Sequence, residues 1–256
     1  MKLGVKCYNN MSIRFENVYK LYKSKGADKI QALDNFCLEI KDNEVFAIAG
    51  VNGAGKTTAL KALFGLIKID KGSVVIENQE KTSIGFAPEI PDLPEYMSVY
   101  EVLELSCNLA GISPSQSEID ATLKLFELTE LSHRQVSTLS KGNRQRLSLA
   151  AAVVFSPSII VFDEPTSGLD PLGRKLIKEV IKHLKKQGKT LIFSTHFLAD
   201  LPELCDKMAI VNNGKIVFSG TVKDFSENTD LEALEKRFSE ICCSTQNDKI
   251  AGEENE

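Results

Sequence analysis

The stretch 50–58, GVNGAGKTT, decides how this chain folds. It fits the pattern G-x-x-x-x-G-K-[ST] of the phosphate-binding P-loop. The apolar segment 45–49 precedes it and a predicted helix over 57–64 follows it, which is the strand–loop–helix context that the pattern requires. Glycines let such a loop curl until its backbone N–H groups point at phosphates, and the helix dipole favours the same anion. The sequence therefore predicts a nucleoside triphosphate site, in which Lys56 reaches the β- and γ-phosphates and Thr57 places a hydroxyl on Mg²⁺.

Composition narrows the class of protein. The chain has 256 residues, 43% of them hydrophobic, and a net charge of -4. That length suits one large domain or a domain with an inserted lobe, and the charge does not favour nucleic acid as the main partner. No apolar stretch approaches the roughly 20 residues of a membrane span, and the N-terminus shows no secretion signal. The six cysteines form no CxxC pair and have no histidine at zinc-ligand spacing.

The hydrophobic pattern divides the chain into α/β parts and a helical lobe. Alternation over 13–18 and 32–40 predicts half-buried strands in the first part. Beyond a proline-rich connector, three predicted helices make a lobe of about Glu89 to Ser156. The α/β pattern then resumes, and the tail from Thr221 is predicted to be helical to about Cys243 and frayed at its end.

Acidic residues follow a second buried strand, which is predicted over 159–162. Asp163 is expected to hold Mg²⁺ opposite Thr57, since parallel strands bind ligands at their carboxyl ends. Glu164 is placed to polarise the water that attacks the γ-phosphate. His196 follows another strand and is either a donor to that phosphate or water, or a purely structural histidine.

The segment 139–146, LSKGNRQR, is a second candidate for anion binding. Ser140 stands at a predicted helix N-cap and Gly142 in the first turn, where a hydroxyl, bare amides and the helix dipole converge. From the residues alone, an ordinary capped helix with a basic first turn explains this segment equally well.

These motifs occur in a specific order, and through them the chain resembles the ATP-binding subunit of ABC transporters. The P-loop, LSxGxxQR, the strand with Asp163-Glu164, the run SGLD ending at Asp170, and the STH run ending at His196 carry the resemblance, which covers about 11–220. It implies an α/β, RecA-like P-loop NTPase core with an antiparallel β subdomain and an inserted α-helical subdomain, followed by a helical tail over 221–256. Within that family, the chain is most similar to the exporter branch, in which the membrane-spanning protein is a separate chain.

The resemblance assigns roles to residues. It implies that Glu164 and His196 are catalytic, that Asp170 links the two sites of a dimer, and that Ser140, Lys141, Gly142 and Asn143 form a signature facing the partner's nucleotide. ATP and Mg²⁺ are the implied cofactors, and Thr57, Asp163 and Glu89 the implied metal-side residues. The implied nucleotide-binding residues are Tyr22, stacked on adenine, with Asn52, Gly53, Ala54, Gly55, Lys56, Thr57 and Thr58.

The chain departs from the family pattern at three positions. Glu89 stands where the family has a glutamine that senses the γ-phosphate and meets the membrane partner. A carboxylate can still bind Mg²⁺ or a water, but it cannot donate an amide hydrogen bond. Lys141 and Asn143 replace the commoner glycine and glutamine of the signature. Because Ser140 and Gly142 remain, we expect a working signature.

Three functions are compatible with these motifs. The expected one is a transport motor on the cytoplasmic face of a membrane, a homodimer or heterodimer driven closed by ATP and joined to a separate permease. The alternative is a soluble ATPase of the same superfamily that acts on DNA or ribosomes, although no inserted coiled coil and no second P-loop is present. A non-hydrolysing regulatory binder would lack Glu164 or His196, and both are present.

Overall fold

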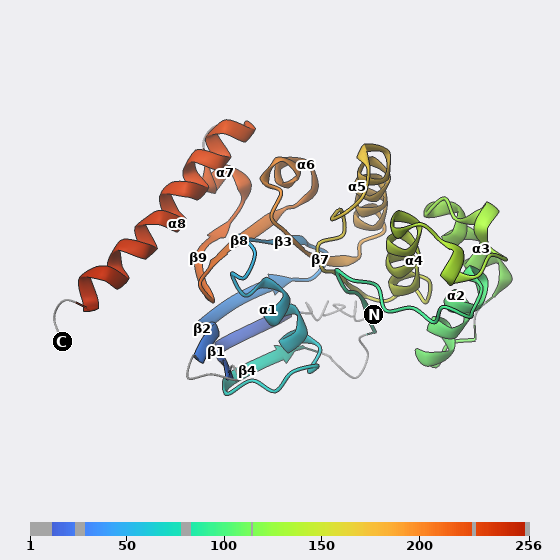
Figure 1. The fold of residues 1–256 in the computed structure, drawn as a ribbon, viewed down its shortest axis with the longest axis horizontal. Helices are drawn as coiled ribbons and strands as arrows, with labels where there is room; N and C mark the ends of the chain where they lie inside the picture. The colour runs from blue at the N-terminus through green and yellow to red at the C-terminus, as the bar shows by residue number, and fades with distance from the viewer. Residues whose placement is uncertain (1–11, 24–28, 78–82, 114, 227–228, 254–256) are drawn as a thin grey trace, which may run out of the picture.

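The computed structural model describes residues 12–23, 29–77, 83–113, 115–226 and 229–253, with side chains to residue 242. Within them, a six-stranded sheet has the order β5-β6-β7-β3-β8-β9 (Figure 1). Neighbours run parallel from β5 to β8, and only the pairing of β8 with β9 is antiparallel. The strands are β3 (Val45–Ala49), β5 (Ile84–Ala87), β6 (Ile159–Phe162), β7 (Thr190–Thr195), β8 (Lys207–Asn212) and β9 (Lys215–Gly220).

A smaller antiparallel sheet faces this core. Its order is β2-β1-β4, from β1 (Ser12–Lys23), β2 (Lys29–Lys41) and β4 (Lys71–Ile76). Helix α1 (Lys56–Leu63) lies between the two sheets, and its Leu60 belongs to one apolar core with Phe36 of β2 and Phe46 of β3. Apolar alternation along β1 and β2 thus fixes one face of the small sheet against α1. The predicted antiparallel subdomain and RecA-like core are confirmed.

A helical lobe lies at one end of the large sheet (Figure 1). It contains α2 (Val99–Leu109), α3 (Gln116–Leu125), the short 3₁₀ turns Thr129–Leu131 (η2) and Val136–Thr138 (η3), and α4 (Lys141–Val153). Complete capping boxes begin α2 at Ser98 and α3 at Ser115, because each serine and the glutamate three residues later bond each other's backbone N–H. The inserted helical subdomain is therefore present.

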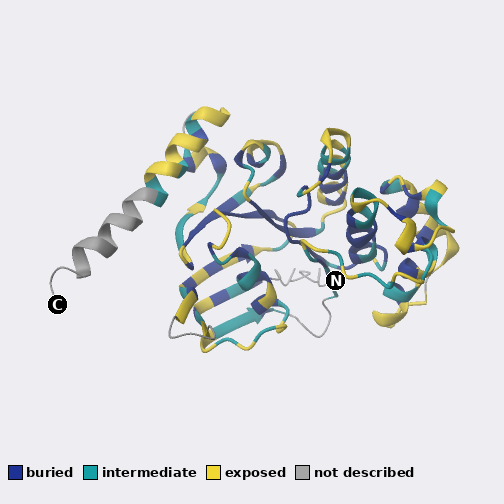
Figure 2. Ribbon diagram, viewed as in Figure 1, coloured by how far each residue is buried: buried dark blue, intermediate teal, exposed yellow. Residues whose placement is uncertain are grey.

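The remaining helices cover the second α/β part. They are α5 (Pro171–Lys186), the 3₁₀ turn η4 (Leu198–Asp200), α6 (Leu201–Leu204), α7 (Val222–Phe225) and α8 (Leu231–Glu253). Buried residues concentrate along the large sheet and on the helix faces turned toward it (Figure 2). Among the described residues no helix is both long enough and apolar enough to cross a membrane.

The tail differs from the sequence-based expectation. Helix α8 continues to Glu253, ten residues beyond the end expected near Cys243. The added segment is polar but has no proline, and helix propensities of ordinary residues differ by only tenths of a kcal/mol. Polarity alone therefore does not end this helix. The last three residues, 254–256, lie outside the described part of the chain.

Candidate nucleotide site

The P-loop connects β3 to α1 at the carboxyl edge of the large sheet. Gly55 is the N-cap of α1 with φ 112, and a Cβ there would lie 2.4 Å from the Ala32 carbonyl oxygen of β2. Only glycine fits this left-handed, closely packed position. Ala54 is buried, whereas Asn52 and Gly53 are exposed. Thr57 and Thr58 lie half-buried in the first turn of α1, which begins at Lys56, one residue earlier than predicted.

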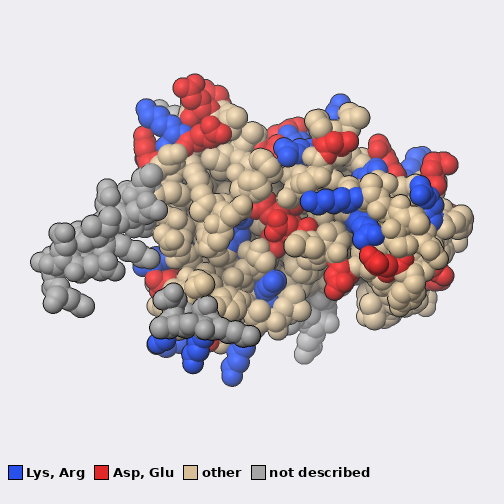
Figure 3. All heavy atoms as spheres, viewed as in Figure 1, with Lys and Arg blue, Asp and Glu red and all other residues tan. Residues whose placement is uncertain are grey.

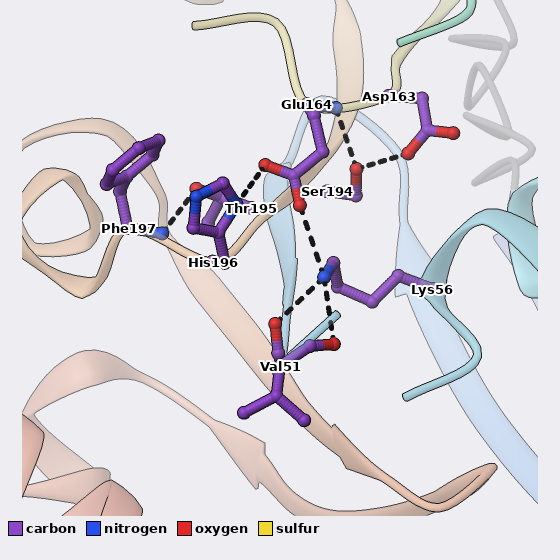
Figure 4. A network of polar contacts seen from close by, with 9 residues as sticks. Val51, Lys56, Asp163, Glu164, Ser194, Thr195, His196 and Phe197 are labelled. Atoms are coloured by element: carbon purple, nitrogen blue, oxygen red, sulfur yellow. Dashed lines mark hydrogen bonds and ion pairs between the residues drawn. The ribbon is translucent and has the colours of Figure 1, made fainter. Parts of the chain in front are cut away.

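The Lys56 ammonium is surrounded by oxygen atoms (Figure 4). It donates hydrogen bonds to the carbonyls of Gly50, at 2.8 Å, and Val51, at 3.2 Å. It also lies 3.1 Å from Glu164 Oε1, and the two side chains are only 6% and 5% exposed. A buried charge pair persists only when each charge is compensated. The structure thus places Glu164 and Lys56, from distant parts of the chain, in direct contact.

Sheet order explains this contact. β7 lies between β3 and β6, so the P-loop, the His196 segment and the Asp163-Glu164 segment leave adjacent strand ends. In register, Ala49 pairs with Thr195, and Phe162 pairs with Phe193. The residues that follow these pairs therefore converge at one edge, as carboxyl ends of parallel strands do.

Glu164 is held in an unusual backbone conformation. Its φ is 48, in the left-handed region that a non-glycine residue seldom adopts, and such outliers concentrate at functional sites. Its backbone N–H donates to Ser194 Oγ at 2.8 Å, and that hydroxyl lies 2.5 Å from Asp163 Oδ1 as donor. Ser194 therefore positions both acidic residues at once.

His196 completes the contact network. Its Nδ1 lies 2.8 Å from Glu164 Oε2, and about a third of its side chain is exposed. The other carboxylate oxygen, Oε1, is buried and makes no hydrogen bond of good geometry, although the Lys56 ammonium is near. Glu164 thus lies between the Lys56 ammonium, near Oε1, and the His196 imidazole, near Oε2.

The oxygen donors at this edge fit a hard divalent cation. Asp163 is 1% exposed, and Thr57 carries its hydroxyl in the first turn of the facing helix α1. Carboxylate and hydroxyl oxygens, completed by phosphate and water, are the ligands that Mg²⁺ prefers. Among the described residues no group of three His, Cys, Asp or Glu side chains forms a metal cluster.

The predicted signature is on a different surface. Ser140 caps α4 by accepting from the Asn143 backbone N–H at 3.3 Å, and Asn143 Oδ1 accepts from Arg146. With Gly142, Gly168 and Asp170 these residues line a hollow of about 410 Å³. Asp170 also caps α5, since its Oδ1 accepts from the Gly173 backbone N–H at 2.7 Å. No described hydrogen bond or ion pair joins this hollow directly to Lys56.

Comparison with known proteins identifies the family. Residues 33–167 match the sequence profile described as ABC transporter. The chain belongs to the ABC transporter family. An uncharacterized ABC transporter ATP-binding protein of Methanocaldococcus jannaschii is 35% identical over 214 residues, which cover 83% of this chain and 78% of that protein. A second, YhcH of Bacillus subtilis, is 38% identical and covers 77% of this chain and 67% of its own length. The human ATP-binding cassette sub-family A member 2 is 32% identical over 84% of this chain, which is 9% of that protein.

Solved structures agree with this assignment. An ATP-binding subunit of an ABC transporter superposes with a TM-score of 0.77 and 26% identity, covering 90% of this chain and 98% of that one. A dimeric ATP-binding cassette in a post-hydrolysis state, bound to ADP and Pi, gives 0.72 and 27%, covering 82% and 98%. The chain is therefore an ABC-type ATPase, an ATP-binding subunit of the transporter family.

Two residues that the family resemblance selects lie beside this ABC core. Tyr22 of β1 is 38% exposed, and the Lys20 ammonium lies 5.2 Å from the centre of the Tyr22 ring. Its partner on β2 is Ile30, two residues before Ala32, whose carbonyl lies against Gly55 of the P-loop. Glu89 is exposed and follows β5, the neighbour of β6. The Asp163 backbone N–H bonds the Ala87 carbonyl at 2.9 Å, which places the Glu89 segment near the acidic pair.

Sequence reasoning missed residues that hold this ABC site together. Ser194 was noted only as part of the STH run, and Phe197 and Arg174 not at all. A polar residue at the end of an apolar strand, next to a strand with an acidic end, was the available signal for Ser194. No local signal marks Arg174 or Phe197, because their contact joins a helix and a loop that the fold brings together.

Proposed function

We propose that this ATPase powers substrate translocation, in the export direction, by a separate membrane-spanning partner. The carrying observation is the buried placement of Glu164 between the Lys56 ammonium and His196 Nδ1. That arrangement provides a phosphate-binding cation, a base and a histidine at one edge of the sheet. The resemblance to exporters with a separate permease supports the direction and the partner.

The roles of the side chains follow from this geometry. Lys56 is bonded to the P-loop carbonyls and paired with Glu164. A triphosphate is a stronger partner for the ammonium, so its binding would release Glu164 Oε1 to accept the proton of the attacking water. His196 would hold the opposite oxygen of that carboxylate. Thr57 and Asp163 would hold Mg²⁺, which neutralises charge on the phosphates, and Tyr22 would stack on adenine.

The signature surface supports a dimer. Ser140 and Asp170 are exposed at a hollow, and no described hydrogen bond or ion pair joins that hollow to Lys56 of the same chain. We infer that Ser140, Lys141, Gly142 and Asn143 face the ATP held by Lys56 of a second copy or a related chain. Nucleotide held between the two surfaces binds the closed dimer better than the open one, and such differential binding can drive closure.

A groove beside Glu89 is the docking site that we assign to the permease. A cavity of about 720 Å³ lies between the connector after β5 and the helices α2 and α4, and its lining includes Pro88, Leu93 and Leu109. Leu109, which lines the cavity, is 80% exposed, as is Ile90 of the adjoining connector. Apolar side chains this exposed at a groove are typical of a protein interface. The partner's cytoplasmic segment would contact the loop that follows β5 in this groove. This contact would hold the ATPase on the cytoplasmic face of the membrane.

Charge distribution favours this partner over a nucleic acid. Acidic and basic side chains are interspersed on the face shown in Figure 3, without a continuous basic surface. The net charge is -4. Binding to a phosphate backbone requires clustered Lys and Arg side chains.

The test is co-purification from detergent-solubilised membranes, followed by reconstitution with the partner. We expect one membrane-spanning chain in stoichiometric amount, and loss of that chain with Leu109→Glu but not with the control Leu66→Glu, a 61% exposed residue elsewhere. ATP supplied on the cassette side of proteoliposomes should move substrate away from that side. A fully active ATPase without any membrane partner, or movement in the opposite direction, would contradict the proposal.

A further inference from the structure

Arg174 connects two loops of the site and belongs to neither. It lies half-buried on α5, and its Nε donates to the Leu169 carbonyl at 3.3 Å. Its guanidinium carbon lies 4.5 Å from the centre of the Phe197 ring. No described acidic side chain comes within ion-pair distance of it. An arginine that stacks on a ring and bonds a carbonyl, without a carboxylate partner, fixes the positions of those two groups relative to each other.

One end of this contact is at the catalytic pair. Phe197 follows His196 directly, and the two rings lie 4.0 Å apart. The Phe197 backbone N–H is bonded to Thr195 Oγ1 at 2.9 Å, which fixes the loop on both sides of the histidine (Figure 4). His196 Nδ1 in turn lies 2.8 Å from Glu164 Oε2. The Phe197 ring therefore lies directly against the histidine that contacts Glu164.

The other end is at the surface that faces the partner. Leu169 precedes Asp170 and is buried. A Cβ built on Gly142 would lie 3.6 Å from Leu169 Cδ2, so this leucine packs against the signature turn of α4. Leu169 thus contacts the signature turn through its side chain and Arg174 through its carbonyl.

The rest of α5 is fastened to the elements after Phe197. The Lys178 ammonium lies 2.5 Å from Asp200 of η4 and 3.1 Å from Glu203 of α6. Lys182 lies 2.6 Å from the same Glu203. α5 and the η4–α6 segment therefore form one frame, and Arg174 is its contact at the end that reaches the site.

We propose that Arg174 is a positioning residue, which holds the Leu169 carbonyl and the Phe197 ring at a fixed distance. In this way the position of His196 against Glu164 depends on the position of the signature surface. Arg174 touches no reacting atom and acts through Phe197. This inference rests on the ATPase activity and on Glu164 as base, and it needs no particular membrane partner. A lysine keeps the charge but lacks the planar group that can stack and donate together.

The test compares Arg174→Met and Arg174→Lys with Lys175→Met, which removes an exposed charge from the next position of the same helix. With the full chain and Mg-ATP, we expect Arg174→Met to lower kcat about 10- to 100-fold, because a misplacement of a catalytic group by about 1 Å can cost up to about 10²-fold. KM for ATP and the melting temperature should stay close to wild type, Arg174→Lys should be intermediate, and Lys175→Met should be unchanged.

A double-mutant cycle examines the contact itself. Phe197→Leu removes the Arg174 contact and also the ring beside His196, so it should lower kcat at least as much as Arg174→Met. The double variant should be no slower than Phe197→Leu, because Arg174 acts through that ring. Multiplying effects, a kcat equal to that of Lys175→Met, or a loss confined to KM or thermal stability would each overturn the inference. Glu164→Gln serves as reference: if it hydrolyses ATP normally, the assignment of the base fails instead.

Discussion

The two functional surfaces of this cassette are built on opposite principles. At the P-loop, Lys56 and Glu164 are almost completely buried, and each contacts several groups of the same chain. At the signature, Ser140 and Asp170 are exposed, and the described hydrogen bond of each side chain is to a backbone N–H in the first turn of its own helix. At the P-loop, the buried charges are compensated by groups of the same chain. At the signature, the polar side chains are exposed to solvent.

This difference shows which surface can be studied in a single chain. Buried charges must be neutralised by the fold that buries them, or their desolvation would oppose folding. Exposed hydroxyls and amides incur no such cost, so they can remain available until a second subunit supplies a ligand. Changes at the P-loop should therefore affect stability as well as catalysis, whereas changes at the signature should affect mainly catalysis.

Glu164→Gln should have the largest effect, since it removes the base while keeping the shape of the side chain. We expect kcat to fall about 10³-fold, roughly 4 kcal/mol. ATP binding should persist, and unhydrolysed ATP should keep the dimer closed. Size-exclusion chromatography with ATP can detect this stable dimer. Normal turnover in this variant would remove Glu164 as the base.

Lys56→Met should destabilise the nucleotide-free protein by about 3 kcal/mol, because it leaves a buried carboxylate without its cation. Urea unfolding measures this change. Adding Glu164→Gln to the same chain should restore part of the loss, and the control Lys141→Met, at an exposed lysine of the other surface, should stay within about 0.5 kcal/mol of wild type. Equal losses at the two lysines would contradict the contrast between the surfaces.

Ser140→Ala should lower turnover about 10²-fold, roughly 2.7 kcal/mol, since it removes one donor from the phosphate of the partner's site. Nucleotide binding to the single chain should be unaffected, because no described contact joins Ser140 to Lys56. Equilibrium binding with a fluorescent nucleotide, alongside steady-state ATPase rates, separates the two quantities. An intact ATPase would show that the signature has been assigned to the wrong segment.

Asp170→Ala should have the smallest effect on folding, about 1 kcal/mol, through loss of the α5 N-cap. Asp170→Asn retains a side-chain oxygen for the Gly173 N–H and should be close to wild type in urea unfolding. If the asparagine variant is stable but slow in ATP turnover, the carboxylate acts beyond capping, as expected of a residue that faces the partner.

Much of this structure could be predicted from the sequence, for local reasons. A P-loop needs glycines at set spacings, a buried parallel strand is short and apolar, and a helix begins at a capping residue. These requirements gave the position of Lys56, the strand before Asp163 and the N-cap of α4 at Ser140. The predicted end of α8 near Cys243 was wrong, since no local rule stops a polar helix that lacks proline.

Tertiary structure decided which of these residues meet. The sequence cannot show that β7 lies between β3 and β6, and that order brings Ser194 to Asp163 and His196 to Glu164. Nor could it show that Glu164 pairs with Lys56 in a left-handed backbone conformation, or that Arg174 stacks on Phe197. Motifs reflect short-range backbone chemistry and are readable residue by residue. Contacts between strand ends and helix faces depend on sheet order and packing, which are properties of the whole chain.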